Sequence, residues 1–218
     1  MPYSCSLYRM RCRTSAWRAS DRDRRPIRAT REVAFAHLLA SGEPVSIERI
    51  ARDLGTSAAS VEAATDALGA AGWVDRDEGG RITGAAGLSL SSGAHRVEIG
   101  GREFRTRCAS DALGIPAALG VDATATRSCG VCGTTLTVPI HRGDPEGGQM
   151  LWMSAGGDDL LDDFCTPTVL RCSEVHGREW GRRRADHGRL LVLATAADEG
   201  RQRWAGCARA ARRLGHAE

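Results

Sequence analysis

Two cysteines and one aspartate carry the most reactive chemistry that this sequence offers. Cys108 and Asp111 stand three positions apart in the run Cys108-Ala109-Ser110-Asp111, and this spacing places both side chains on one face of a helical turn. A thiolate is a soft-metal ligand and a carboxylic acid is a proton donor. Cys165 offers a second thiol from far along the chain. The trio predicts a site that holds a soft metal between two thiolates and protonates a carbon attached to it.

Each member of this trio also has an ordinary structural interpretation. An aspartate that follows Ser110 is a common helix N-cap, and a buried cysteine packs as a small hydrophobe. Burial would favour the catalytic interpretation of Asp111, because loss of solvent raises the pKa of a carboxyl group and keeps a proton available on it.

A second group of cysteines indicates another metal site. Cys129 and Cys132 lie in a CGVCG run, which is the knuckle sequence seen in zinc ribbons. A tetrahedral site needs two more ligands, and Cys172 with His176, in a Cys-x₃-His spacing, could supply them. Three interpretations stay open: a structural zinc site, a redox-active dithiol and a secondary site for soft metals. His141 is interpreted as a surface turn residue.

The composition is that of a globular protein with one or two domains. The 218 residues are 42% hydrophobic and 26% charged, and no apolar run approaches the roughly 20 residues of a membrane span. No apolar signal-peptide core follows the N-terminus, so we expect a cytoplasmic protein without a membrane partner. Eight cysteines in such a chain favour metal or thiol chemistry over a disulfide framework. Cys207 is interpreted as a packing residue.

The N-terminal segment is strongly basic. Residues 1–31 contain nine arginines and two aspartates, whereas the whole chain has a net charge of only +3. Such an arm could contact nucleic acid or a membrane surface. We instead interpret residues 1–29 as a disordered leader.

Three short helices and a hairpin are expected next. The helices begin after cap residues and the first two end at glycines; the caps are Thr30, Ser46 and Thr56 or Ser57, and the glycines are Gly42 and Gly55. A polar turn at 75–80 between two short apolar runs predicts a hairpin. Three helices followed by a hairpin indicate a winged helix-turn-helix domain over 30–86.

The usual role of this domain is to read DNA with its later helix. Between Thr56 and Asp75 there is no basic residue, while Glu62, Asp66 and Asp75 are acidic. A helix without cations is a poor reader of a polyanion. We therefore expect a structural or substrate-covering role, and no nucleic-acid partner.

The remaining residues, 87–218, predict an α+β domain. A hairpin over 97–105 leads into Cys108, and Pro116 is expected to interrupt a helix over 112–119. Further elements alternate between the two types: strands at 135–140, 150–153 and 190–193, and helices at 158–163, 174–184 and 196–214. The order lacks a regular βαβ rhythm, so the fold class is α+β.

The segment 97–120 resembles the organomercurial lyases, also called alkylmercury lyases. The resemblance rests on Val-Glu-Ile at 97–99, Cys-Ala-Ser-Asp-Ala-Leu at 108–113 and Pro-Ala-Ala-Leu-Gly at 116–120, and it covers 30–204. In that family the cysteine and aspartate of a Cys-Ala-x-Asp motif work with a distant cysteine, which implies these roles for Cys108, Asp111 and Cys165. Cys129 stands where members often have a further, structural cysteine. Arg107 and Thr166 replace residues that are commonly aromatic or apolar.

The resemblance implies a function as well as a fold of a winged-helix-like domain followed by an α+β catalytic domain. The two thiolates would attack the mercury of R–Hg⁺, and Asp111 would shuttle a proton to the leaving carbon. The products would be R–H and Hg(II). No organic cofactor is implied; low-molecular-weight thiols would be co-substrates, and a mercuric reductase could receive the ion. The alternative is a non-catalytic protein that binds soft metals or zinc, or a metal-responsive winged-helix regulator.

Overall fold

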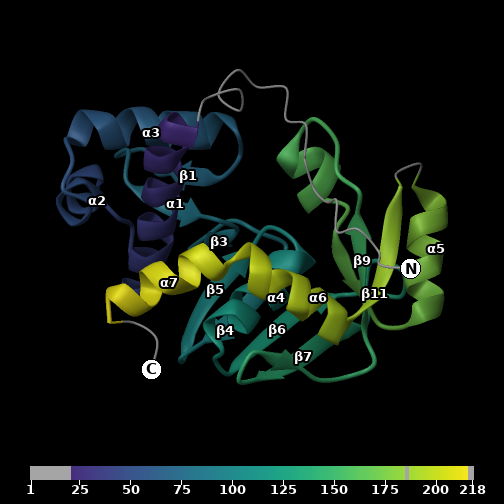
Figure 1. Cartoon of the computed structure of the whole chain (residues 1–218). Coiled ribbons are helices and arrows are strands. Elements are labelled where there is room, and N and C mark those ends of the chain that lie inside the picture. Colours follow the sequence, from purple (N-terminus) through teal and green to yellow (C-terminus); the bar gives the residue numbers. More distant parts are fainter. Residues whose placement is uncertain (1–20, 185–186, 216–218) are drawn as a thin grey trace, which may run out of the picture.

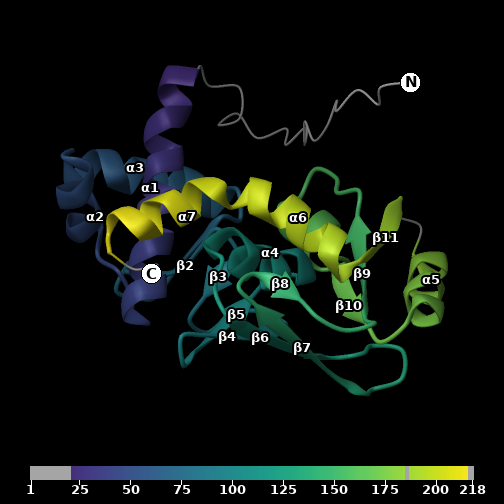
Figure 2. The same cartoon turned by 60° about the horizontal axis from the view of Figure 1, so that its bottom comes forward.

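Two antiparallel sheets and the helices packed on them make up the chain in the computed structural model, which describes residues 21–184 and 187–215 (Figures 1 and 2). The predicted leader lies mostly in residues 1–20, outside the described residues. Among the helices of the described part, none is long and apolar enough to cross a membrane. The α+β class predicted from the sequence is confirmed.

The first three helices are α1 (Asp21–Ser41), α2 (Ile47–Leu54) and α3 (Ala58–Ala70). Ser46 and Ser57 cap α2 and α3 as predicted, since their side chains accept the backbone N–H groups of Arg49 and Ser60. The prediction that the first helix starts at Thr30 is wrong, and so is a disordered state for 21–29.

The earlier start of α1 has a packing cause. Arginine is a good helix former, and Ile27 packs against the hydrophobic core. Thr30 therefore lies within α1, where it is buried. Arg31 stacks on Trp73, with its guanidinium carbon 4.7 Å from the ring centre.

The predicted wing is part of a larger sheet. Eight strands pair in the order β1-β2-β3-β5-β4-β6-β7-β8. Their bounds are β1 Val74–Arg76, β2 Ile82–Ala85, β3 Leu88–Ser89, β4 His95–Ile99, β5 Arg102–Thr106, β6 Ala123–Ser128, β7 Thr135–His141 and β8 Asp144–Pro145. Gly100 and Gly101 both have positive φ, at 57° and 74°, which makes a tight β4–β5 hairpin turn and directs the chain toward Cys108.

The smaller sheet lies beside the larger one and has three strands. They are β10 (Val169–Arg171), β9 (Met150–Ser154) and β11 (Gly188–Val192), in that order. Helix α5 (Glu174–Arg183) packs on this sheet (Figure 2). A π-helix, η2 (Leu160–Cys165), stands in place of the predicted acidic helix.

Helix α4 (Ala109–Leu119) is almost entirely buried between the larger sheet and α6 (Leu193–Arg203) (Figure 1). It continues through Pro116, so the predicted interruption there is wrong. Gly114 and Gly200 form the crossing of α4 and α6, and a Cβ on Gly200 would lie 2.2 Å from the Cα of Gly114. The single helix expected over 196–214 is instead α6 and α7 (Ala205–Arg213), divided at Trp204.

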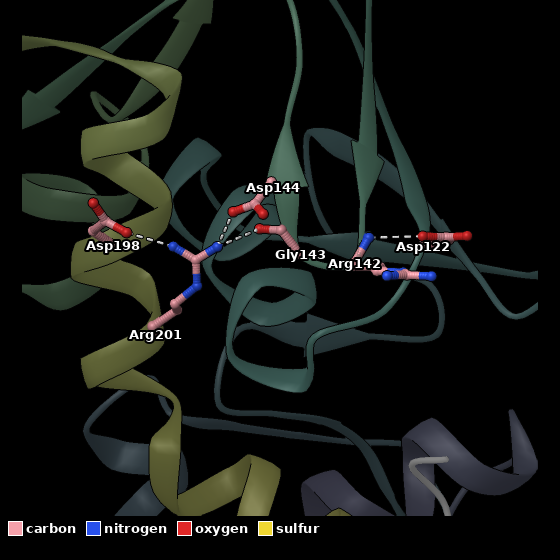
Figure 3. A network of polar contacts seen from close by, with 6 residues as sticks. All are labelled: Asp122, Arg142, Gly143, Asp144, Asp198 and Arg201. Atoms are coloured by element: carbon pink, nitrogen blue, oxygen red, sulfur yellow. Dashed lines mark hydrogen bonds and ion pairs between the residues drawn. The ribbon is translucent and has the colours of Figure 1, made fainter.

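A polar network attaches α6 to the turn between β7 and β8 (Figure 3). Arg201 donates to the carbonyl of Gly143 at 3.2 Å and pairs with Asp144 and Asp198. Gly143 packs against the backbone of Ala117, because a Cβ there would lie 3.0 Å from it. The network therefore holds α6 and the last turn of α4 in register.

Candidate active site

Cys108, Asp111 and Cys165 meet in one buried cluster. The sulfur atoms and a carboxylate oxygen all lie within 4.8 Å of one another. The three residues are 0%, 6% and 7% exposed, respectively. The fold thus brings the sequence-distant Cys165 to the pair that the spacing placed together.

The start of α4 positions Cys108 and Asp111. Cys108 is the N-cap residue, and its backbone N–H donates to Asp111 Oδ2 at 3.0 Å. Asp111 is therefore not the N-cap but the third residue of the helix, and its carboxylate faces back toward the cap. The hydroxyl of Thr106 donates to the Cys108 carbonyl at 3.3 Å, which fixes the end of β5 against the helix.

The end of η2 positions Cys165. Thr166 N–H donates to the carbonyl of Leu161 at 2.8 Å, a bond across five residues that defines the π-turn. Thr168 N–H then bonds back to the carbonyl of Cys165 at 3.2 Å, and the Thr168 carbonyl accepts the N–H of Ala109 at 3.1 Å. The backbone of Thr168 therefore connects the segments that carry the two cysteines.

The electrostatics of the cluster favour protonated groups. Burial raises the pKa of the Cys108 thiol well above its usual value, and the hydrogen bond with Cys165 and the charge of Asp111 raise it further. Burial also raises the pKa of Asp111, against the opposing effects of its bonds with Cys108 and of two arginines, Arg203 and Arg107. The cluster can therefore store a proton beside two sulfurs.

An apolar cavity of about 250 Å³ adjoins the cluster. Large apolar side chains form much of its lining together with two residues of the trio; these are Trp73, Leu160, Phe164 and Trp204, with Asp111 and Cys165. Gly87, with φ +89°, is needed at its edge, because a Cβ there would lie 2.5 Å from the Asp111 carboxyl group. The cavity fits a small organic group better than a charged one.

Two arginines complete the lining of the cavity. Arg107 donates to Asp75 on β1 at 2.6 Å, and Arg203 donates to the Ser110 hydroxyl at 2.7 Å. Arg203 also lies over the ring of Phe164, 5.3 Å from its centre. Arg107 stands where the family commonly has an aromatic residue. Its bond to Asp75 connects the candidate site to the wing.

The winged-helix domain supplies part of this site. Trp73 and Asp75, the partner of Arg107, both come from it. The acidic residues of α3 are paired by the wing, because Arg76 lies 2.6 Å from Glu62 and 3.3 Å from Asp66. Arg76 is thus engaged with carboxylates instead of being available to phosphates.

Sequence reasoning missed the residues that shape the cavity. Trp204 stands where one long helix was expected, and its indole N–H donates to the Ala86 carbonyl at 2.8 Å. Arg203 precedes it. The sequence did offer one signal for Trp204 and Arg203. Trp204 is a large aromatic residue within a predicted helix that is otherwise rich in alanine and arginine.

The second cysteine group also converges. The ligand atoms of Cys129, Cys132, Cys172 and His176 all lie within 4.8 Å of one another. The first two come from the β6–β7 turn and the last two from the β10–α5 corner. Cys207 is buried, as expected of a packing residue, and His141 is exposed.

Comparison with known proteins decides the family. The family model for alkylmercury lyase (MerB) matches residues 88–206, and the model for the helix-turn-helix domain of alkylmercury lyase matches 25–86. The chain belongs to the alkylmercury lyase family. The architecture expected from the resemblance, a helix-turn-helix domain followed by an α+β domain, is confirmed.

Individual alkylmercury lyases agree with this assignment. The chain is 38% identical to the alkylmercury lyase of Streptomyces lividans over 104 residues, which are 48% of this chain and 46% of that protein. It is 36% identical to that of Pseudomonas putida over 145 residues, 66% and 65% of the two chains. These matches therefore span about half and just under two thirds of the relatives' lengths.

One solved structure has a similar fold. The crystal structure of the mercury-bound form of MerB2 superimposes with a TM-score of 0.73 at 18% identity. The alignment covers 84% of this chain and 91% of that one. This likeness establishes the common fold.

Proposed function

We propose that this protein cleaves the carbon–mercury bond of R–Hg⁺ compounds by protonolysis, giving R–H and Hg(II). The observation that carries the proposal is the buried convergence of Cys108, Asp111 and Cys165 beside an apolar cavity. Membership of the alkylmercury lyase family supports the same reaction. Two thiolates suit a soft ion that accepts linear coordination.

Substrate capture begins at Cys165. This cysteine lines the cavity, whereas Cys108 is fully buried behind it. The Cys165 sulfur displaces a small thiolate from R–Hg–SR′, and its proton leaves with R′SH. The organic group R then occupies the apolar cavity.

Cleavage uses the second thiol and the carboxyl group. The raised pKa of Cys108 keeps its proton in place until mercury arrives. Asp111 takes this proton as the Cys108 sulfur binds mercury, and it delivers the proton to the carbon as the C–Hg bond breaks. R–H departs and mercury, still Hg(II), stays on two sulfurs, so no oxidant or reductant is consumed.

Product release needs an exchange partner. Hg(II) on two buried thiolates leaves by exchange with low-molecular-weight thiols, and a mercuric reductase is a suitable acceptor. No organic cofactor takes part in these steps, because the two thiols supply both protons and both final mercury ligands.

The proposal is tested by a turnover assay. The purified full-length protein is incubated with a phenylmercury or methylmercury salt and excess thiol, and benzene or methane is measured with inorganic Hg(II). We expect hydrocarbon well above a thiol-only control. Folded protein that releases none above that control would overturn the proposal.

A further inference from the structure

The cluster of Cys129, Cys132, Cys172 and His176 takes no part in the reaction above. Its four donor atoms all lie within 4.8 Å of one another. The sulfurs of Cys132 and Cys172 lie 3.7 Å apart, and Cys129 Sγ lies 3.8 Å from His176 Nδ1. Ligands about 2.3 Å from a tetrahedral zinc ion are separated by roughly 3.8 Å. Cys172 Sγ and His176 Nδ1 are closer, at 2.8 Å, and need to separate slightly on binding.

The turn that carries Cys129 and Cys132 is built like a zinc knuckle. Cys129 N–H donates to the Thr134 carbonyl, and Gly133 N–H donates to the Cys129 carbonyl, both at 2.8 Å. Gly133 has φ +76°, which favours glycine at that position. These two backbone bonds close the turn between Cys129 and Thr134.

Cys129 lies among backbone amide groups. The N–H groups of Cys172, Cys132 and Val131 point toward its sulfur. A sulfur that accepts several amide N–H groups is preorganised as a metal ligand.

A buried cation next to the cluster supplies a second, independent observation. The Arg171 side chain is fully buried, and its Nε and Nη2 atoms lack a hydrogen-bond partner within the described structure. The guanidinium stacks on Trp180, 4.0 Å from the ring centre, and lies against Gly130 of the knuckle. An unpaired buried charge is costly unless an opposite charge lies nearby.

Zinc with three thiolates and a neutral imidazole carries a net charge of −1. Such a centre is the anion that Arg171 otherwise lacks. The mixed sulfur and nitrogen ligands are typical of zinc, and four protein ligands leave no open position for a substrate. This donor set separates the cluster from the two-sulfur Cys108–Cys165 pair.

We propose that Cys129, Cys132, Cys172 and His176 form a closed structural zinc site that joins the β6–β7 turn of the larger sheet to the β10–α5 corner of the smaller one. β10 begins at Val169, shortly after Cys165, and Cys172 follows β10. The zinc ion therefore also holds the strand that orients η2, while the catalytic trio binds mercury independently.

Metal analysis of the untagged full-length protein tests the site. Protein purified without chelator is expected to hold about one zinc ion per chain. After removal of zinc, cobalt(II) should restore binding and give the visible absorption of a tetrahedral, sulfur-rich centre. The zinc-free protein should unfold at a lower temperature than the zinc-loaded protein. Protein that holds no zinc and takes up neither ion would overturn the proposal.

Matched variants separate this site from the catalytic one. Cys132→Ser and His176→Ala should lower zinc content by at least about fivefold. Cys207→Ser and His141→Ala change the same residue types elsewhere and should keep it. The double variant Cys108→Ser/Cys165→Ser should also keep its zinc although it cleaves nothing. Loss of zinc from this double variant, with zinc retained by Cys132→Ser, would contradict the assignment.

Discussion

Opposing effects act on the pKa of the Asp111 carboxyl group. Burial raises the pKa of its carboxyl group, while the hydrogen bonds from Cys108 and the charges of Arg203 and Arg107 lower it. The pKa of the Cys108 thiol is raised by burial, by Cys165 and by the charge of Asp111, and a backbone hydrogen bond with Asp111 opposes this only weakly. In the proposed mechanism the Cys108 thiol holds the proton at rest, and Asp111 moves it to the leaving carbon.

Replacing Asp111 with asparagine should separate binding from cleavage. The amide oxygen can still accept the Cys108 N–H, but the side chain can no longer carry a proton. We expect hydrocarbon release to slow by about 10²–10⁴-fold, with Hg(II) still bound by the two sulfurs. Stability should be unchanged or slightly higher, because a neutral group replaces a buried acid. Assays of turnover, mercury retention and denaturant unfolding check this; full turnover would exclude the shuttle role.

His95 should make the fold sensitive to acid. Burial lowers its pKa well below the usual value, and the charges of Arg127 and Arg171 lower it further. Arg127 donates to His95 Nε2 at 3.1 Å, so the folded imidazole stays neutral. Below about pH 6.5 the unfolded chain takes up a proton that the folded chain refuses. This contribution to stability is therefore present above pH 6.5 and is lost as the pH falls.

A His95→Gln variant removes this proton-linked contribution. The free energy of unfolding of the wild type should fall with decreasing pH more steeply than that of the variant, by at most about 1.4 kcal/mol per pH unit. Denaturant titrations at pH 7, 6 and 5 measure both slopes. Equal slopes would mean that His95 is not kept neutral.

At the scale of the elements, the close packing of α4 against α6 positions the candidate site. The crossing at Gly114 and Gly200 lets α6 press on α4, whose first turn carries Cys108 and Asp111. Trp204 packs beside the crossing, and Arg201, in the same last turn of α6, attaches the helix to the β7–β8 turn (Figure 3). Because the helices have no room to shift, the trio is held rigidly.

Gly200→Ala should disturb this packing. Its Cβ would lie 2.2 Å from Gly114 Cα, so the helices must move apart, at a cost of about 1–3 kcal/mol. Turnover should fall together with the stability.

Gly69→Ala in α3 is the matched control, because its Cβ would meet only the Val74 carbonyl, at 3.9 Å. That variant should be slightly more stable than the wild type, by about 0.5–1 kcal/mol. Thermal or denaturant unfolding compares them; equal stabilities would contradict the tight crossing.

Local sequence signals predicted some of these elements and missed others for physical reasons. Ser46 and Ser57 cap their helices because the signal and the structure are both local. The short strands β6 and β10 were missed, since Ala-Thr alternation in β6 and three residues in β10 give little hydrophobic periodicity. The π-turn of η2 depends on tertiary contacts that place Cys165.

The same distinction applies to the candidate site. The Cys108–Asp111 pair was predictable from its spacing on one helical turn. Cys165 was named as the second thiol on its chemistry, and the family resemblance gave it the same role. No local rule could show that it meets the pair, because that contact depends on η2, Thr168 and the packing of two sheets. The four residues of the second cluster were named from knuckle spacing, but their convergence is likewise tertiary.

The two domains act as one structure at the scale of the whole molecule. The wing strands β1 and β2 continue the sheet of the catalytic domain through β3. Trp73 lines the cavity and Asp75 binds Arg107. The helix-turn-helix module therefore forms part of the wall of the cavity beside the cysteines.

Breaking the Asp75–Arg107 pair should loosen this part of the wall. Asp75→Asn leaves the guanidinium of Arg107 without its carboxylate, which should cost about 1–3 kcal/mol of stability. Because the pair lies at the cavity edge and not at the reacting atoms, we expect KM to rise more than kcat falls. Steady-state kinetics and denaturant unfolding measure both effects. A pure loss of kcat with unchanged KM would argue against a covering role.

The most direct test of the central claim is a single turnover with less substrate than protein and no added thiol. For wild type and Cys207→Ser, we predict one hydrocarbon molecule per substrate molecule, with Hg(II) remaining on the protein. Cys165→Ser and Cys108→Ser should release none on the same time scale. Equal hydrocarbon yield from the Cys165→Ser variant, or Hg(II) held by wild type without hydrocarbon release, would contradict cleavage by two thiols and an acid.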